Sequence, residues 1–146
     1  MNSHIKTQFI EYFFNGIKPQ TNLKIGVEQE KFLFDKKTKK RISYETVKKI
    51  FNNLKKYNWT PIFEKENIIG LKRGKQQITT EPGLQCELSG EPLSNIHEVC
   101  RESSKYLTEI KEATKNLDLI SAPVGFDPYN VIKQIPKNPK EDPGKP

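Results

Sequence analysis

Apolar residues recur at a helical period in three segments of the chain. Near the N-terminus Ile5, Phe9 and Phe13 lie four residues apart and predict a helix over residues 3–14. Ser43 is a suitable N-cap for a second helix, and Ser94 is one for the longest helix. The apolar stripe of the second helix is Val47, Ile50, Phe51 and Leu54, and that of the third is Ile96, Val99, Cys100, Leu107, Ile110, Ala113 and Leu117.

Short runs rich in β-branched and aromatic residues predict strands between these helices. They cover residues 24–35, 59–64, 67–71, 76–89 and 119–126. Pro82-Gly83 interrupts the fourth run, which indicates an edge strand or a bulge. Hairpins combined with helices predict the α+β class, with a mostly antiparallel sheet covered by helices over residues 1–126. Residues 127–146 contain five prolines and are expected to form an extended or disordered tail.

Composition narrows the function classes. The 146 residues carry a formal net charge of +7. Lysine outnumbers arginine and no nucleic-acid-binding motif is present, so no nucleic-acid partner is expected. No segment has the length of a membrane span, and two cysteines do not make a disulfide framework, so a cytoplasmic protein is expected. Cys100 lies on an apolar stripe and is expected to be a core residue rather than a reactive thiol.

Two pairs of glutamates are the candidates for chemistry. Glu28 and Glu30 are two residues apart, so on a strand their side chains point to one face. Glu81 and Glu87 flank the Pro82-Gly83 interruption and could face the first pair if both segments lie in one sheet. Four converging carboxylates repel each other, and oxygen ligands of this kind suit Mg²⁺ or Mn²⁺. The alternative interpretation is a solvent-facing strand, which is common for Glu-x-Glu.

Three ordered segments carry a resemblance to a known family. They read Gly26-Val27-Glu28-Gln29-Glu30-Lys31-Phe32, then Ile69-Gly70-Leu71-Lys72-Arg73-Gly74-Lys75-Gln76, then Ile78-Thr79-Thr80-Glu81-Pro82-Gly83-Leu84-Gln85-Cys86-Glu87-Leu88-Ser89-Gly90. In this order they resemble the motifs of glutamate–cysteine ligases of the plant and proteobacterial type. Gly125-Phe126-Asp127-Pro128 and Ile135-Pro136 resemble later motifs of the same family, so the resemblance runs from about Gly26 to Lys140.

The resemblance implies an activity and a set of site residues. Such ligases use ATP to join the γ-carboxylate of L-glutamate to the amine of L-cysteine, the first step of glutathione biosynthesis. Their sheet resembles the funnel of glutamine synthetase, so a partial funnel is expected here. The motif match implies that Glu28, Glu30, Glu81 and Glu87 bind Mg²⁺ or Mn²⁺. Gln85, Lys72 and Lys75 are weaker candidates for substrate binding, because a strand glutamine and hairpin lysines are equally typical of a wet surface.

Two departures from the family pattern limit this interpretation. Leu84 stands where the family has a second glycine, which would narrow access of the backbone to a ligand. After Pro139-Lys140 the family pattern continues through a large further portion, whereas this sequence reads six more residues. The chain is therefore expected to be an N-terminal piece, inactive alone, with the missing portion as a candidate partner chain. The alternative is a non-catalytic basic binding module that retains part of the ligase fold.

Overall fold

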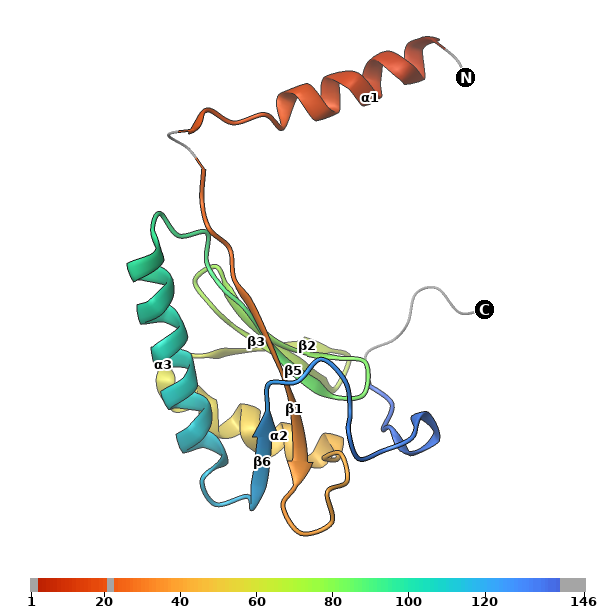
Figure 1. Ribbon diagram of the computed structural model, residues 1–146, viewed down its shortest axis with the longest axis vertical. Coiled ribbons are helices and arrows are strands. Elements are labelled where there is room, and N and C mark those ends of the chain that lie inside the picture. The colour runs from red at the N-terminus through yellow and green to blue at the C-terminus, as the bar shows by residue number, and fades with distance from the viewer. Residues whose placement is uncertain (1–2, 21–22, 140–146) are drawn as a thin grey trace.

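The computed structural model describes residues 3–20 and 23–139 of the chain. Six strands form one antiparallel sheet in the order β2-β3-β4-β5-β1-β6, which confirms the α+β class (Figure 1). The strands are β1 (Glu28–Asp35), β2 (Thr60–Glu64), β3 (Asn67–Arg73), β4 (Gln76–Glu81), β5 (Gln85–Ser89) and β6 (Leu119–Ala122). The helices are α1 (Ser3–Asn15), α2 (Tyr44–Leu54) and α3 (Ile96–Thr114), with short 3₁₀ turns η2 (Lys55–Tyr57) and η3 (Ile132–Gln134). The funnel expected from the resemblance stays a prediction.

The predicted interruption at Pro82-Gly83 is a hairpin turn between two interior strands. Residues 76–89 were expected to form one broken strand at an edge or bulge, but β4 and β5 pair with each other and lie inside the sheet. Gly83 and Leu84 both adopt positive φ, at 78° and 58°, which reverses the chain direction. The proline therefore lies in the turn, where its missing N–H removes no ladder hydrogen bond.

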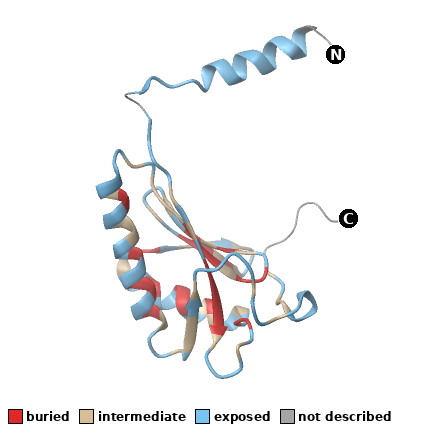
Figure 2. Ribbon diagram, viewed as in Figure 1, coloured by how far each residue is buried: buried red, intermediate tan, exposed pale blue. Residues whose placement is uncertain are grey.

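Helices α2 and α3 cover one face of the sheet. The Ser43 hydroxyl accepts a hydrogen bond from the Thr46 N–H, which confirms it as the N-cap of α2. Figure 2 shows the buried positions concentrated on α2, α3 and the central strands. The predicted stripe of α2 is fully buried, and the core residues it meets from the sheet and from α3 are Leu33, Ile68, Leu71, Ile78, Cys86, Leu88, Tyr106, Ile110 and Ala113.

The buried face of α3 differs from the predicted one. The N-cap is Asn95 rather than Ser94, and it accepts from the Glu98 N–H. Val99 and Ile110 are buried as expected, but Ile96 and Leu107 are 57% and 44% exposed. Ala113, which also belongs to the predicted stripe, is buried as expected, and the other buried residues of α3 are Tyr106 and Glu109. Cys100 is exposed while Cys86 is buried, so the expectation that Cys100 is a core residue is wrong.

Glu109 is buried because it closes a polar network between α3 and β3. Its carboxylate accepts from the Trp59 Nε1 at 2.8 Å and from an Arg73 Nη1 at 2.8 Å. The Arg73 guanidinium stacks on the Trp59 ring, 4.1 Å from its centroid. The carboxylate therefore has a charge partner and two donors in the core, which is what makes its burial tolerable.

Helix α1 stands apart from the sheet (Figure 1). It confirms the predicted N-terminal helix, and each of residues 4–15 is exposed. Just before β1, Ile25 pairs with Leu93 in an isolated antiparallel bridge. In the described residues no helix combines the length and the apolar character that crossing a membrane requires.

Candidate active site

Three neighbouring strands bring the predicted glutamates onto one face of the sheet. Glu30 of β1 pairs directly with Glu87 of β5, and Glu81 of β4 pairs with Gln85 of β5. Paired residues share a face and side chains alternate along a strand, so Glu28 lies on this face as well. We call the face that carries Glu28, Glu30, Glu81, Gln85 and Glu87 the acid face. It is the face opposite α2 and α3, because the intervening residues of these strands point into the helix-covered core.

Hydrogen bonds tie the centre of the acid face together. The Glu87 side chain is held by the Ser89 hydroxyl, which donates to its Oε1 at 2.8 Å. The Gln85 Nε2 donates to Glu30 Oε2 across the β5–β1 pairing. Glu87 is buried whereas Glu28 and Glu30 are exposed. The acid face thus presents a carboxylate pair, Glu30 and Glu87, whose members differ in contact with water.

The glutamates share a face but do not converge. Among the side chains that the structure describes, no three His, Cys, Asp or Glu residues are grouped so as to hold a metal ion. Glu28 pairs with Ser89, two residues along the strand from the Glu30–Glu87 pair. Glu81 has Gln85, not another glutamate, as its cross-strand partner. Only Glu30 and Glu87 are direct cross-strand neighbours, and like charges placed in this way repel each other. The metal-binding role of the four glutamates stays a prediction.

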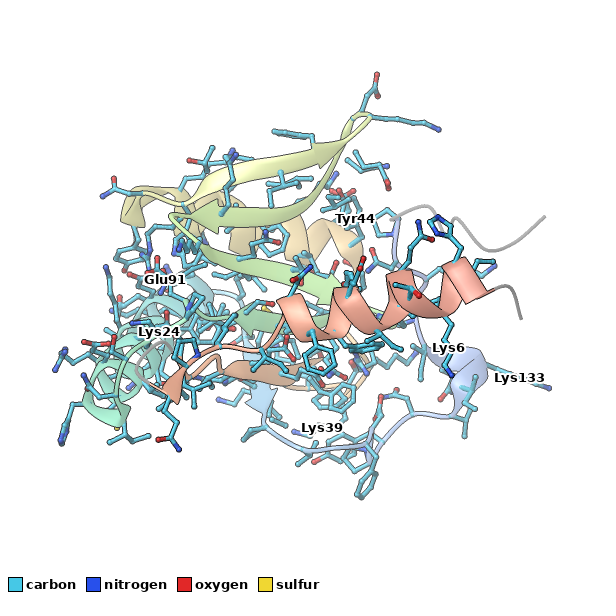
Figure 3. The ribbon with its side chains drawn as sticks, turned by 90° about the horizontal axis from the view of Figure 1, so that it is seen from above. Lys6, Lys24, Lys39, Tyr44, Glu91 and Lys133 are labelled. Atoms are coloured by element: carbon cyan, nitrogen blue, oxygen red, sulfur yellow. The ribbon has the colours of Figure 1, made fainter. Side chains whose placement is uncertain are left out.

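The two candidate lysines lie at the margin of this face. Lys72 pairs with Gln77, which pairs with Ser89, so Lys72 lies three strands from Glu28, about 14 Å at the usual strand spacing. Lys75 lies in the β3–β4 turn, where its N–H donates to Glu91 Oε1 at 3.3 Å. Glu91 lies beside α3, as Figure 3 shows. Both lysine side chains are exposed, and their substrate-binding role is likewise a prediction.

A buried arginine holds the β4–β5 turn at the end of the acid face. The Arg41 side chain is only 1% exposed, and its Nη2 donates to the carbonyl of Gly83. Its Nη1 lies 3.5 Å from Asp127 Oδ2, and its guanidinium lies 4.2 Å from the centroid of the Phe32 ring. Because Glu81 and Gln85 flank this turn, Arg41 contributes to the placement of both.

Asp127 is held in its ionised form. Burial opposes the charge, but hydrogen bonds from Tyr129 and Asn130, together with the Arg41 charge, outweigh it and hold the pKa of Asp127 below its usual range. The Tyr129 N–H donates to Oδ1 at 2.9 Å. The carboxylate therefore links the chain after β6 to Arg41 and, through it, to the β4–β5 turn.

The segment after β6 packs on the same turn. A Cβ on Gly83 would lie 2.6 Å from Ile135 Cγ2, so a side chain there is excluded as well as strained. The Asn138 Nδ2 donates to the Thr80 carbonyl at 2.6 Å. Of the tail predicted over residues 127–146, residues 127–139 are irregular apart from η3 and make these contacts, and residues 140–146 lie outside the described part. The domain boundary at residue 126 stays a prediction.

Behind the acid face, three polar side chains meet in the core. The Cys86 Sγ lies 3.7 Å from the Tyr106 hydroxyl, and Lys31 Nζ lies 5.1 Å from the Tyr106 ring centroid. Burial raises the pKa of Cys86 and of Tyr106 and lowers the pKa of Lys31. Lys31 belongs to the first family motif, but its side chain points away from the glutamates beside it because strand side chains alternate.

Sequence reasoning missed the residues that support this site. The contact of Ser89 with Glu87 could have been predicted, since residues two apart on a strand have their side chains on the same face. Asp127 lies in the Gly125–Pro128 motif, but nothing in the sequence indicated its contact with Arg41, because the two residues are 86 positions apart and only the fold brings them together. Tyr106 was passed over for its neighbour Leu107, which is more apolar but faces outward.

The donor chemistry of the acid face fits a hard divalent cation. All its charged groups are carboxylates, and oxygen ligands are what Mg²⁺ and Mn²⁺ prefer. A cation near Glu30 and Glu87 would also remove the repulsion between directly paired like charges. The neighbouring Gln85 and Ser89 add neutral oxygen and N–H groups that can hold a ligated water or a substrate.

Comparisons with known proteins assign the chain to a family. A family model described as glutamate-cysteine ligase family 2 matches residues 24–141. Curated relatives include the chloroplastic glutamate–cysteine ligase A of rice, 39% identical over 92% of this chain and 28% of the rice protein. The chloroplastic ligases of Medicago truncatula and Arabidopsis thaliana are 37% and 35% identical over 92% of this chain, which is 27% and 26% of those proteins.

These relatives correct one expectation and limit another. They are named chloroplastic, which contradicts the cytoplasmic location expected from composition. The chain spans about a quarter of the length of the curated relatives that it matches, so it corresponds to part of their fold. A family model that matches most of the chain, together with the ordered motifs on the acid face, shows that this chain belongs to glutamate-cysteine ligase family 2.

Proposed function

We propose that this chain forms the acidic wall of an active site that joins L-glutamate to L-cysteine at the expense of ATP, for glutathione biosynthesis. The observation that carries the proposal is the direct pairing of Glu30 with Glu87 on a sheet face that α2 and α3 leave uncovered. A second portion of the ligase, corresponding to the part of the relatives that this chain does not match, supplies the remaining walls.

The roles follow from the charges involved. The γ-carboxylate of glutamate is a poor electrophile, so it attacks the terminal phosphate of ATP to form an acyl phosphate, with ADP as the leaving group. The cysteine amine then attacks the acyl carbon, and inorganic phosphate leaves. A bound Mg²⁺ or Mn²⁺ would supply positive charge to offset that of the phosphates. Glu28, Glu30, Glu81 and Glu87 are the residues that would hold the metal, and Gln85, Lys72 and Lys75 are those that would bind substrate.

Metal binding by the isolated chain tests the first step of this proposal. Titration with Mn²⁺, followed by electron paramagnetic resonance, should show weak binding to the purified chain. The variant Glu30→Gln with Glu87→Gln should weaken it on the order of tenfold to a hundredfold, since even residues that only support metal ligands have such effects.

Glu66→Gln is the matched control, because Glu66 is an exposed glutamate in the turn between β2 and β3. It should leave the titration unchanged. Equal Mn²⁺ binding by all three proteins would contradict the metal role of the acid face. It would favour the alternative of a non-catalytic binding module.

A further inference from the structure

A pocket of about 390 Å³ opens between α3 and the strands β1 and β6, on the helix-covered side of the sheet. Leu33 and Ser121 pair across β1 and β6, so both side chains point to this side rather than to the acid face. Leu33, Leu107 and Ile110 give the pocket an apolar wall, and Lys31, Lys111 and Ser121 are its polar groups. Binding sites for small molecules typically combine an apolar wall with a few polar groups in this way.

Lys31 is the buried cation of this pocket, with only 7% of its surface exposed. Among the described residues it forms no ion pair. Its Nζ donates to Gln29 Oε1 at 3.3 Å, and the Gln29 amide is fixed because its Nε2 donates to Ser103 Oγ at 2.8 Å. The Tyr106 ring centroid lies 5.1 Å from the same Nζ.

The described neighbours of Lys31 supply no negative charge. Gln29 is uncharged, and burial raises the pKa of Cys86, the cross-strand partner of Lys31, and of Tyr106, so both keep their protons at neutral pH. A buried ammonium whose contacts are all neutral is costly, because they do not replace the hydration that it loses. An anion in the pocket would supply the missing counter-charge.

We propose that this pocket binds a small organic carboxylate with an apolar body. The carboxylate lies against Lys31 Nζ, and the apolar body lies against Leu33, Leu107 and Ile110. Lys111 and Ser121 are exposed, and they add a second positive charge and a hydroxyl donor where the pocket meets water. The site does not rest on the proposed ligase reaction, whose residues lie on the opposite face of the sheet.

Inorganic phosphate fits this pocket less well than a carboxylate does. A phosphate dianion carries more charge than one buried ammonium offsets, and its desolvation is correspondingly more expensive. It also has no apolar part to cover the leucine and isoleucine side chains. The apolar wall therefore favours a carboxylate joined to a short hydrocarbon chain.

Titration of the full-length, ¹⁵N-labelled chain with hexanoate tests the site. Nuclear magnetic resonance should show saturable shifts of backbone amides around Ile110 and Ser121. Because a hydrogen bond to a charged group is lost without the carboxylate, 1-hexanol should bind at least about tenfold more weakly. Inorganic phosphate should also bind more weakly than hexanoate.

Two variants and one matched control assign the binding to Lys31 and the pocket. Lys31→Met keeps the unbranched chain without the charge, and it should raise the dissociation constant for hexanoate at least about tenfold. Lys105→Met removes a lysine from an exposed position of α3 outside the pocket and should bind like the native chain. Ser121→Asp adds a repelling carboxylate at an exposed position of β6 and should also weaken binding.

Urea unfolding checks that the three variants fold. Lys31→Met should unfold at a urea concentration no lower than the native chain does, because it removes a buried charge. If it fails to fold, Ser121→Asp still decides the question. The site would be overturned by the absence of saturable shifts, by shifts confined to other parts of the chain, or by native affinity in the folded Lys31→Met or in Ser121→Asp. Equal binding of hexanoate and 1-hexanol, or of hexanoate and phosphate, would overturn the carboxylate as its ligand.

Discussion

At the scale of single residues, the two cysteines are placed to react differently. Cys86 of β5 is buried beside Tyr106, and burial raises its pKa, whereas Cys100 is exposed on α3. Because the thiolate is the reactive form, we expect one thiol per native chain to react rapidly with Ellman's reagent and two to react in denaturant. Cys100→Ser should abolish the rapid phase and Cys86→Ser should keep it. Two rapid thiols in the native chain would show that Cys86 is accessible.

Asp127 should make stability depend on acid pH. Its native pKa lies below the ordinary value of about 3.9, so its contribution is present above that value and is lost as pH falls through the native pKa. Asp127→Asn should cost about 1.5–3 kcal/mol at pH 7, the range for hydrogen bonds to a charged group, and this cost should shrink towards pH 3.

Urea unfolding of both proteins from pH 3 to pH 7 measures this difference. Asp118→Asn, at an exposed aspartate, should change stability little at any of these pH values. If the stability lost on Asp127→Asn were the same at every pH, the charge of the Asp127 carboxylate would not be the source of the stabilisation, which would contradict the prediction.

At the scale of elements, Glu109 connects α3 to the sheet. Glu109→Ala removes the acceptor of Trp59 and the charge partner of Arg73, whose side chain is 16% exposed. Leaving a nearly buried cation unpaired typically costs about 3–5 kcal/mol, and we expect the lower end because Arg73 keeps some contact with water. Chemical denaturation should show this loss, and Glu112→Ala, one turn further on the exposed side of α3, should cost less than about 1 kcal/mol. Similar costs for the two would contradict the network.

The β4–β5 turn depends on Gly83 in a comparable way. Gly83→Ala places a Cβ where φ is 78° and where Ile135 already lies, so we expect a loss of about 1–2 kcal/mol from the backbone alone and more from the clash. Gly26→Ala is the matched control, since nothing lies within 4 Å of a Cβ there. Adding Ile135→Ala to Gly83→Ala should remove the clash and restore that part of the lost stability, so that only the cost of the strained backbone remains. No recovery would show that Ile135 is not what the new methyl group meets.

Local patterns predicted the elements well and their faces less well. The stripe from Val47 to Leu54 is buried as predicted, because its apolar residues at a 3.6-residue period define a single face of the helix. On α3 the pattern favoured Leu107 over Tyr106, but Tyr106 fills the core beside Cys86 and Leu107 is left at the margin. The family motifs and strand alternation predicted that the two pairs of glutamates share one sheet face, but the direct pairing of Glu30 with Glu87 depends on the strand register and was not predicted. The Arg41–Asp127 contact depends on tertiary structure and could not be read from spacing.

At the scale of the whole molecule, the two faces of the sheet differ in what covers them. One is closed by α2 and α3 and supplies the core, while the other presents the glutamates. The apolar residues that remain exposed are concentrated in α1 and in the segment around Ile132. One face of the sheet is therefore closed by helices, while Glu28, Glu30 and these apolar residues are exposed to solvent.

That asymmetry predicts that the purified chain alone forms no measurable γ-glutamylcysteine. Phosphoryl transfer needs cationic groups around the developing charge as well as metal ligands, and each missing donor costs about a hundred- to a thousand-fold in rate. On the acid face the candidate cations Lys72 and Lys75 lie at the margin, and Glu28 and Glu30 are open to water, which weakens every electrostatic contribution. Mass spectrometry of a reaction with ATP, Mg²⁺, L-glutamate and L-cysteine should therefore find product with rice ligase A and none with this chain. ATP-dependent product from the chain alone, abolished by Glu28→Ala, would show instead that one wall of the site is sufficient for turnover.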